Sequence, residues 1–162
     1  YILIPSLLVF AQPMNRTIDD TYGDLVTQLQ VTYSNNWHAG QTCGVCAVSP
    51  SQAQAYAGTW HDTTSDNPNS TTLHTATLQF NGPDITILTN ASFELDGLLL
   101  DTFKHPPQPI EDQYLYNVLL FSMSALVNTE HTLVMTAVQG ESPSLLLFDY
   151  AIYTWVRSLN RS

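Results

Sequence analysis

The segment Leu73-His-Thr-Ala-Thr-Leu-Gln-Phe80 decides the fold class, because its side chains alternate in character from His74 onward. In an extended chain, every second residue points to the same face. The two faces are His74, Ala76, Leu78 and Phe80 against Thr75, Thr77 and Gln79. Such alternation is typical of a β-strand with one face on a core and the other toward solvent. The segment therefore predicts a half-buried strand rather than a helix.

Segments of the same kind recur along the chain. They are short, rich in β-branched and aromatic residues, and separated by Gly, Pro, Asn and Ser: residues 29–34, 85–88, 92–103, 114–121, 131–138 and 144–155. Asp96-Gly97 between two apolar runs indicates a hairpin turn. Because no helical pattern alternates with the strands, we expect an all-β protein, a jelly-roll-like antiparallel β-sandwich. We expect one such domain over residues 14–162, preceded by an apolar extension over residues 1–13.

The composition excludes several partners. The chain has 162 residues and a formal net charge of −10, and only 11% of its residues are charged. It has only four basic residues: Arg16, Lys104, Arg157 and Arg161. Because they cannot form a basic patch, we expect neither nucleic acid nor anionic lipid as a partner. No apolar run approaches the roughly 20 residues that span a bilayer, so we expect no membrane span.

Four Asn-x-Ser/Thr sequons favour passage through a eukaryotic secretory pathway: Asn15, Asn69, Asn90 and Asn160. A sequon that carries a glycan must be exposed. A surface covered by uncharged polar residues also suits a secreted or fibrous β protein. We therefore expect an extracellular, glycosylated protein.

Cys43-Gly-Val-Cys46 contains the only two cysteines. A redox site of the thioredoxin type would need a βαβ unit to present it, and a zinc site would need two further ligands at suitable spacing. Neither is evident, so we predict a local disulfide that tightens a loop, and no bound metal or cofactor. Its short loop places the stabilisation at the low end of about 2–4 kcal/mol.

The polar segment Thr59-Trp-His-Asp-Thr-Thr64 invites two functional interpretations. His61 beside Asp62 suggests acid–base chemistry, but neighbours on a strand point to opposite faces and do not orient each other. We therefore expect no catalytic residue. Aromatic residues here could instead stack on a sugar, although aromatics on strands more often belong to the core. The possible glycan contacts are Trp37, Trp60, His61 and Asp62.

The acidic residues Asp19, Asp20 and Asp24 allow two interpretations as well. Clustered carboxylates could hold a calcium ion, but the segment is not an EF-hand loop. We favour a solvated acidic turn.

Several short sequence motifs along the chain, taken together, indicate a known family. They include NRTIDDTYGD, CGVC, AYAGTWHDTT, SFELDG, YNVLLFSMSAL, HTLVM and LLLFDYAIYT, and they cover about Asn15 to Thr154. In combination they resemble a large family of secreted or membrane-anchored basidiomycete fungal proteins. The resemblance implies a galactose-binding-domain-like β-sandwich, an extracellular setting and contact with glycans, and it supplies no catalytic residues.

Two departures from that family matter. The chain reaches Ser162 without the membrane helix that often follows the domain, so we expect a released protein. The family has an extra apolar strand after the phrase matching Gln79–Gly82, whereas here Pro83-Asp84 leads directly into Ile85. We therefore expect a sandwich that lacks one strand and has an unpaired edge.

The N-terminal segment is apolar on both alternating faces. Its large apolar residues are Tyr1, Ile2, Leu3, Ile4, Leu7, Leu8, Val9 and Phe10. Part of this segment could also serve in export. A strand of this kind must be covered on both faces. Fixing the backbone of ten residues costs roughly 10–20 kcal/mol of conformational entropy. Burying about seven such side chains returns at most roughly 10–20 kcal/mol. Hydrogen bonds to a sheet edge are therefore needed.

That edge belongs either to the same chain or to the next subunit. We hypothesise the second, donor-strand complementation, which makes a head-to-tail homopolymer on the fungal cell surface. The main rival is a monomeric module that binds cell-wall glycans. An enzyme is the third interpretation.

Overall fold

The computed structural model describes residues 12–44, 46, 48–65, 71–87, 91–102, 116–119, 121–137 and 144–157. In this part of the chain the regular elements are β-strands and two short 3₁₀ helices, η1 (Gly40–Thr42) and η2 (Tyr56–Gly58). All strand pairs are antiparallel. The predicted all-β antiparallel class is confirmed. The donor-type strand over residues 1–10 lies outside the described residues.

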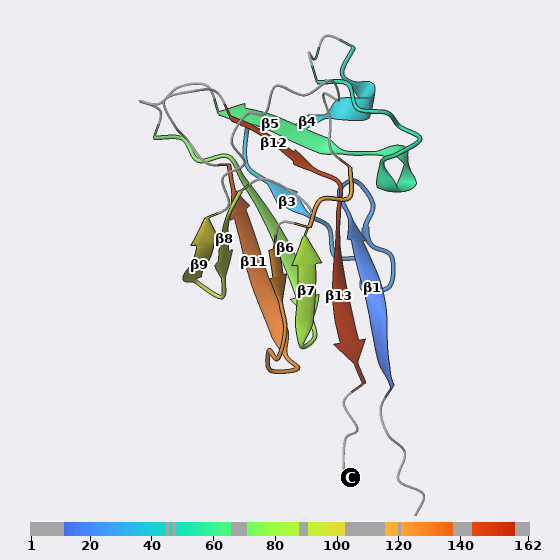
Figure 1. Cartoon of the computed structure of the whole chain (residues 1–162), viewed down its shortest axis with the longest axis vertical. Coiled ribbons are helices and arrows are strands. Elements are labelled where there is room, and N and C mark those ends of the chain that lie inside the picture. The colour runs from blue at the N-terminus through green and yellow to red at the C-terminus, as the bar shows by residue number, and fades with distance from the viewer. Residues whose placement is uncertain are drawn as a thin grey trace, which may run out of the picture.

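The strands form three sheets, which Figure 1 labels by strand. Sheet A has the order β10 (Phe121–Met123), β7 (Asp84–Ile87), β13 (Tyr150–Val156), β1 (Pro13–Asp19) and β2 (Gly23–Asp24). Sheet B has the order β3 (Thr32–Tyr33), β6 (Thr75–Asn81), β11 (Glu130–Thr136), β8 (Ser92–Leu95) and β9 (Leu98–Thr102). Sheet C has the order β12 (Ser144–Phe148), β5 (His61–Ser65) and β4 (His38–Ala39), and it lies across one end of the other two (Figure 1).

Sheets A and B pack face to face around the core. The alternation that predicted β6 is confirmed, because Ala76, Leu78 and Phe80 are all buried. Aromatic pairs show which strands face each other: the ring centroids of Phe80 and Tyr153 are 5.7 Å apart, and those of Phe93 and Phe121 are 4.7 Å apart. β6 therefore packs on β13, and β8 packs on β10. Each large apolar side chain buried in this way contributes roughly 1.5–3 kcal/mol.

The hairpin predicted at Asp96-Gly97 joins β8 to β9, with Leu95 opposite Leu98. Both turn residues have positive φ, 51° for Asp96 and 82° for Gly97. This is the geometry that a two-residue hairpin of type I′ requires, and it explains the residue types.

The position predicted for a strand over residues 114–121 is wrong. Within the described residues, the strand there is β10 at Phe121–Met123, and Tyr116–Leu119 are not part of a strand. Asn117 has a φ of 54°, which is incompatible with an extended strand. Alternation of apolar residues alone did not reveal this break.

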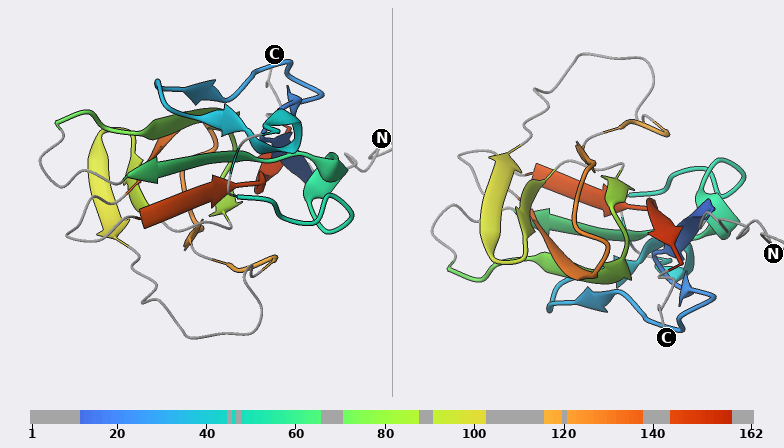
Figure 2. Two further views of the ribbon diagram at one scale, coloured as in Figure 1. Left: turned by 90° about the horizontal axis from the view of Figure 1, so that it is seen from above. Right: turned by 90° about the horizontal axis from the view of Figure 1, so that it is seen from below.

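The run predicted as one strand over residues 144–155 is divided at Asp149 between two sheets. β12 pairs with β5 in sheet C, and β13 pairs with β1 and β7 in sheet A. The backbone of Asp149 accepts a hydrogen bond from Asp20 N at 3.0 Å, so the end of β1 is joined to this break. Figure 2 shows the two parts of the run from both ends of the molecule. Strands that change sheet at a bend are typical of sandwich corners.

Gly82 carries the chain from sheet B to sheet A in two residues, between β6 and β7. A Cβ added here would overlap the carbonyl oxygen of Thr154, so only glycine permits this close crossing over β13. The absence of a strand relative to the resembled family stays a prediction. What the sandwich does have is an incomplete edge, because β3 pairs with only Ala76 and Thr77 of β6.

Candidate functional site

A buried polar cluster occupies the corner where β1 ends, β5 begins and β12 passes to β13. We call it the polar corner and define it as Asp19, Asp20, Thr59, His61 and Asp149. These residues come from three distant parts of the sequence, and the ends of the strands bring them together.

Asp20 is the centre of the polar corner. Its side chain is 0% exposed. Thr59 Oγ1 donates to one carboxylate oxygen at 2.6 Å, and His61 Nδ1 and Thr21 Oγ1 donate to the other at 2.6 and 2.8 Å. A buried carboxylate is tolerated only when it is paired and hydrogen-bonded in this way. Asp20 therefore fixes the start of β5 to the end of β1.

Tyr33 covers the polar corner with its ring. The ring stacks on His61 with centroids 4.2 Å apart and planes 11° apart, and its hydroxyl donates to the Asp20 carbonyl at 2.8 Å. Trp37 also packs against Tyr33, at 5.0 Å between ring centroids. Burial, with added repulsion from Asp20 and Asp19, raises the pKa of Tyr33 far above its usual value. Its hydroxyl therefore stays a donor at any physiological pH.

Asp149 is a carboxyl group of the polar corner whose pKa is raised toward neutrality. Both of its carboxylate oxygens lie within hydrogen-bond distance of Tyr56 N, at 2.9 and 3.1 Å. Burial and the nearby charges of Asp20 and Asp19 outweigh this bond and raise the pKa of Asp149 to about 6. Burial, with added repulsion from Asp20, likewise raises the pKa of Asp19. The polar corner can therefore take up a proton in mildly acidic solution.

The prediction of a solvated acidic turn is wrong, because Asp19, Asp20 and Asp24 are all buried. Asp24 accepts hydrogen bonds from Tyr153 Oη at 2.6 Å and from Val26 N at 2.7 Å. Among the residues that the structure describes, no group of three or more His, Cys, Asp or Glu side chains is placed to hold a metal ion. The calcium alternative therefore has no support, and local donors satisfy most of these carboxylate oxygens instead.

The predicted glycan contacts do not form an exposed platform. Trp60 and Asp62 are each 3% exposed, Trp37 is half-buried against the core, and His61 is engaged with Asp20. As expected for strand neighbours, His61 and Asp62 point to different surroundings.

Trp60 and Asp62 meet at Gly40. A Cβ at Gly40 would overlap Trp60 Nε1 and crowd Asp62 Oδ1, and neither atom has a hydrogen-bond partner in the structure. Burial raises the pKa of Asp62. Tight packing around Gly40 explains why these side chains are inaccessible to a sugar.

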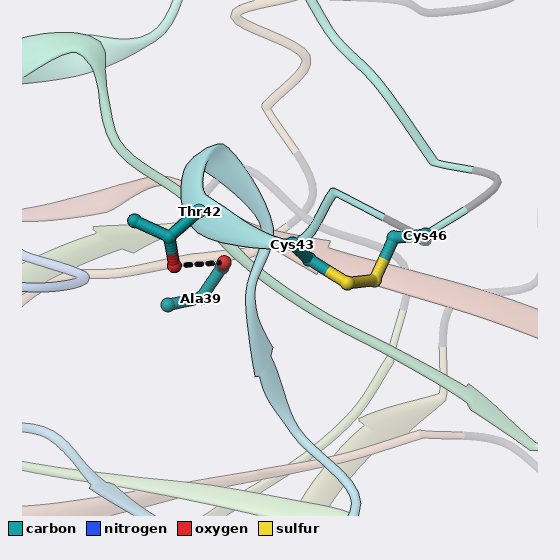
Figure 3. The surroundings of a disulfide bond; sticks show 4 residues. All are labelled: Ala39, Thr42, Cys43 and Cys46. Atoms are coloured by element: carbon teal, nitrogen blue, oxygen red, sulfur yellow. Dashed lines mark hydrogen bonds between the residues drawn. A yellow bond between two sulfur atoms is a disulfide. The ribbon is translucent and has the colours of Figure 1, made fainter.

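The predicted disulfide between Cys43 and Cys46 is confirmed, with 5.4 Å between the two Cα atoms. Figure 3 shows it directly after η1, where Thr42 Oγ1 donates to the Ala39 carbonyl at 3.0 Å. Both features fix the loop that follows β4.

Of the four sequons, the structure describes only Asn15; Asn69, Asn90 and Asn160 lie outside the described residues. Asn15 is exposed on β1, and its Oδ1 accepts a hydrogen bond from Thr154 Oγ1 at 3.2 Å. An exposed asparagine is what a used sequon requires. Its glycosylation stays a prediction.

Exposed leucines on β9 were missed by the sequence reasoning. Leu98 is 65% exposed and Leu99 is 64% exposed. β8 pairs with one edge of β9, and no described strand pairs with the other. The signal was present in the sequence: Leu98, Leu99 and Leu100 are apolar at consecutive positions, as are the residues of the N-terminal segment.

None of the helices in the described part of the chain is long and apolar enough to cross a membrane. Comparisons of the chain with protein-family models, with curated proteins and with solved structures found no match. The resemblance to basidiomycete proteins therefore stays a prediction.

Proposed function

We propose that this protein is a non-catalytic, extracellular structural subunit that assembles into a filament through its N-terminal segment. In this proposal the apolar strand of one copy adds to a sheet edge of the next copy. The fungal, cell-surface setting is part of the same proposal and rests on the sequons, the low charge and the family resemblance.

The proposal rests on two observations: the N-terminal segment is apolar on both faces, and β9 and β3 are the outermost described strands of sheet B. Residues 1–10 need cover on both faces and hydrogen bonds to a sheet. Within the described residues, the outer edge of β9 has no strand partner, and β3 covers only two of the seven residues of β6. Exposed strand edges are templates for pairing with another chain.

The glycan-binding alternative has less support. Two of its four predicted contacts, Trp60 and Asp62, are buried, and His61 is bonded to Asp20. Stacking on a sugar would require an exposed aromatic face.

The direct test compares the full chain with a variant that lacks residues 1–12. We expect the full chain to form filaments in negative-stain micrographs and the deletion variant to stay monomeric by light scattering. The triple variant Leu3→Ser, Leu7→Ser and Val9→Ser keeps the chain length and removes one apolar face, so it should also stay monomeric. A full chain that remains monomeric at high concentration would refute the proposal.

A further inference from the structure

We propose that β9 is the acceptor edge of this assembly, and that it receives residues 1–10 of a second copy rather than of its own chain. This inference rests on the proposed function and adds to it the site of docking and the reason for polymerisation.

The first two residues of β9, Leu98 and Leu99, are apolar, and the strand ends in the polar Asp101 and Thr102. Leu98 and Leu99 are consecutive, so their side chains point to opposite faces, and both are about two-thirds exposed. Leu100 is packed partly against the core. An exposed edge strand of this composition is a predicted site of association with another chain.

The N-terminal segment matches this edge in composition. Each of its faces carries four large apolar residues, and the segment has no charged side chain. Added beside β9, it would cover Leu98 on one face and Leu99 on the other, and cross-strand apolar pairs of this kind stabilise a sheet. Main-chain hydrogen bonds to the edge of β9 at Leu98 and Leu99 would supply the remaining affinity.

The outer edge of β1 is a poorer acceptor. Over Pro13–Thr17 no described strand pairs with it, since β2 covers only Ile18 and Asp19. Its first residue has no N–H to donate, and the next residues include the polar Asn15, Arg16 and Thr17. A segment that is apolar on both faces would find apolar neighbours on β9 and mostly polar ones here.

The position of β1 indicates that a second copy supplies the strand. β1 lies three strands from β10 in sheet A, and β10 packs on β8, which β9 follows at the edge of sheet B. With strands about 4.8 Å apart and sheets about 10 Å apart, β1 and β9 are roughly 20 Å from each other. If the segment pairs through Phe10, only Ala11 and Gln12 link it to Pro13, and these three residue steps reach about 10 Å.

β1, to which the donor segment is attached, and the acceptor β9 therefore lie on opposite sides of the sandwich. Figure 1 shows β1 at one side and β9 at the other, and the two views of Figure 2 agree. A contact between two different surfaces repeats from copy to copy, and it builds an open chain unless the rotation closes a ring.

The experiment mixes two half-defective proteins. One is the variant without residues 1–12, which has no donor. The other keeps the segment and carries Leu98→Lys and Leu99→Lys, which block the acceptor with charge. We expect each to be monomeric alone. Residues 1–10 of the second should then dock on the intact β9 of the first, giving a 1:1 dimer by light scattering that does not extend.

The matched control carries Leu25→Lys and Val26→Lys. These residues are 73% and 65% exposed, close to Leu98 and Leu99, and the change in charge is the same. We expect this control to assemble as the full chain does. Thermal melting of all variants verifies that each is folded.

The outcomes separate the two proposals. If removing residues 1–12 leaves assembly unchanged, the proposed function fails. If that deletion abolishes assembly but Leu98→Lys with Leu99→Lys assembles like the control, β9 is not the acceptor and the proposed function stands.

A cross-link decides between one copy and two. The two native cysteines are bonded to each other, so an Ile4→Cys, Leu99→Cys variant has only two reactive thiols. With a bifunctional maleimide, docking between copies gives a ladder of oligomers on a denaturing gel. An internally linked monomer would overturn the assignment to a second copy.

Discussion

Two histidine–aspartate pairs in the described residues differ in which partner is buried. In the polar corner, His61 Nδ1 lies 2.6 Å from Asp20, whose side chain is fully buried, while that of His61 is 17% exposed. At the β8–β9 hairpin, His131 Nδ1 lies 2.7 Å from Asp96, but here the histidine is buried and the Asp96 side chain is 49% exposed. The two pairs have similar lengths, but they differ in which charged group is removed from solvent.

This comparison indicates that the buried partner of each pair determines which part of the structure the pair stabilises. The buried carboxylate of Asp20 is held by three donors, two from a distant segment (Thr59 and His61) and one from the adjacent Thr21. His131 is held between two acceptors, Asp96 Oδ2 and the Val127 carbonyl, both at 2.7 Å. Burial alone would lower the pKa of His131, but these two hydrogen bonds outweigh it and raise the pKa. The first pair stabilises a corner between sheets, and the second stabilises a charged imidazole beside a turn.

The largest effect should come from Asp20→Ala. The change leaves His61, Thr59 and Thr21 without their buried acceptor, so we expect a loss of about 3 kcal/mol in the free energy of unfolding. Urea unfolding followed by tryptophan fluorescence at pH 7 measures it. A loss no greater than that of Asp96→Ala would contradict the comparison.

Asp96→Ala should cost about 1 kcal/mol, because one partner of the pair is exposed and solvent screens it. The raised pKa of His131 means that its contribution is complete below its ordinary value of about 6.5 and is lost as pH rises through the raised value. The lowered pKa of Asp96 means that its contribution is present above about 4 and is lost as pH falls. Unfolding at pH 5.5 and pH 8.5 should therefore show the larger loss at pH 5.5. Equal losses at both pH values would show that the pair is not ionised as described.

The smallest effect should come from Asp149→Asn, which changes a carboxyl with no histidine partner. The pKa of Asp149 is about 6 in the folded protein and about 4 in the unfolded chain, so the folded state binds more protons between these values. Stability contributed by this group therefore falls as pH rises from about 4 to 6. Asn keeps an acceptor for Tyr56 N, so the variant should show a flatter pH dependence in that window and an unchanged one above pH 7. A slope equal to that of the wild type would exclude Asp149 as the titrating group.

Local patterns in the sequence were enough for some of the strands and for one turn. The alternation around Leu78 predicted β6 and its buried face. Asp96-Gly97 predicted the hairpin, and the two cysteines, Cys43 and Cys46, predicted the disulfide. Each depends on residues that are close in the chain, so propensity and periodicity carry the information.

The polar corner could not be predicted in the same way. Asp20 and His61 are 41 residues apart, and nothing local indicates that a strand end would bring them together. Composition favours exposure for aspartate, so burial of Asp19, Asp20 and Asp24 runs against the usual rule. The break at Asp149 is also not marked in the sequence, because residues 144–155 are apolar at both alternating sets of positions, and the buried positions change there from Leu146 and Phe148 to Ala151 and Tyr153.

The ladder between β1 and β13 has a mechanical consequence. Its register runs without a shift from Pro13 opposite Val156 to Asp19 opposite Tyr150. A pull on the residues before Pro13 acts along the axis of β1, so it loads the hydrogen bonds of the ladder in shear, all at once. Unzipping them one by one would need a force across the strand. The ladder of β1 and β13 therefore resists a force directed along β1 better than a force directed across it.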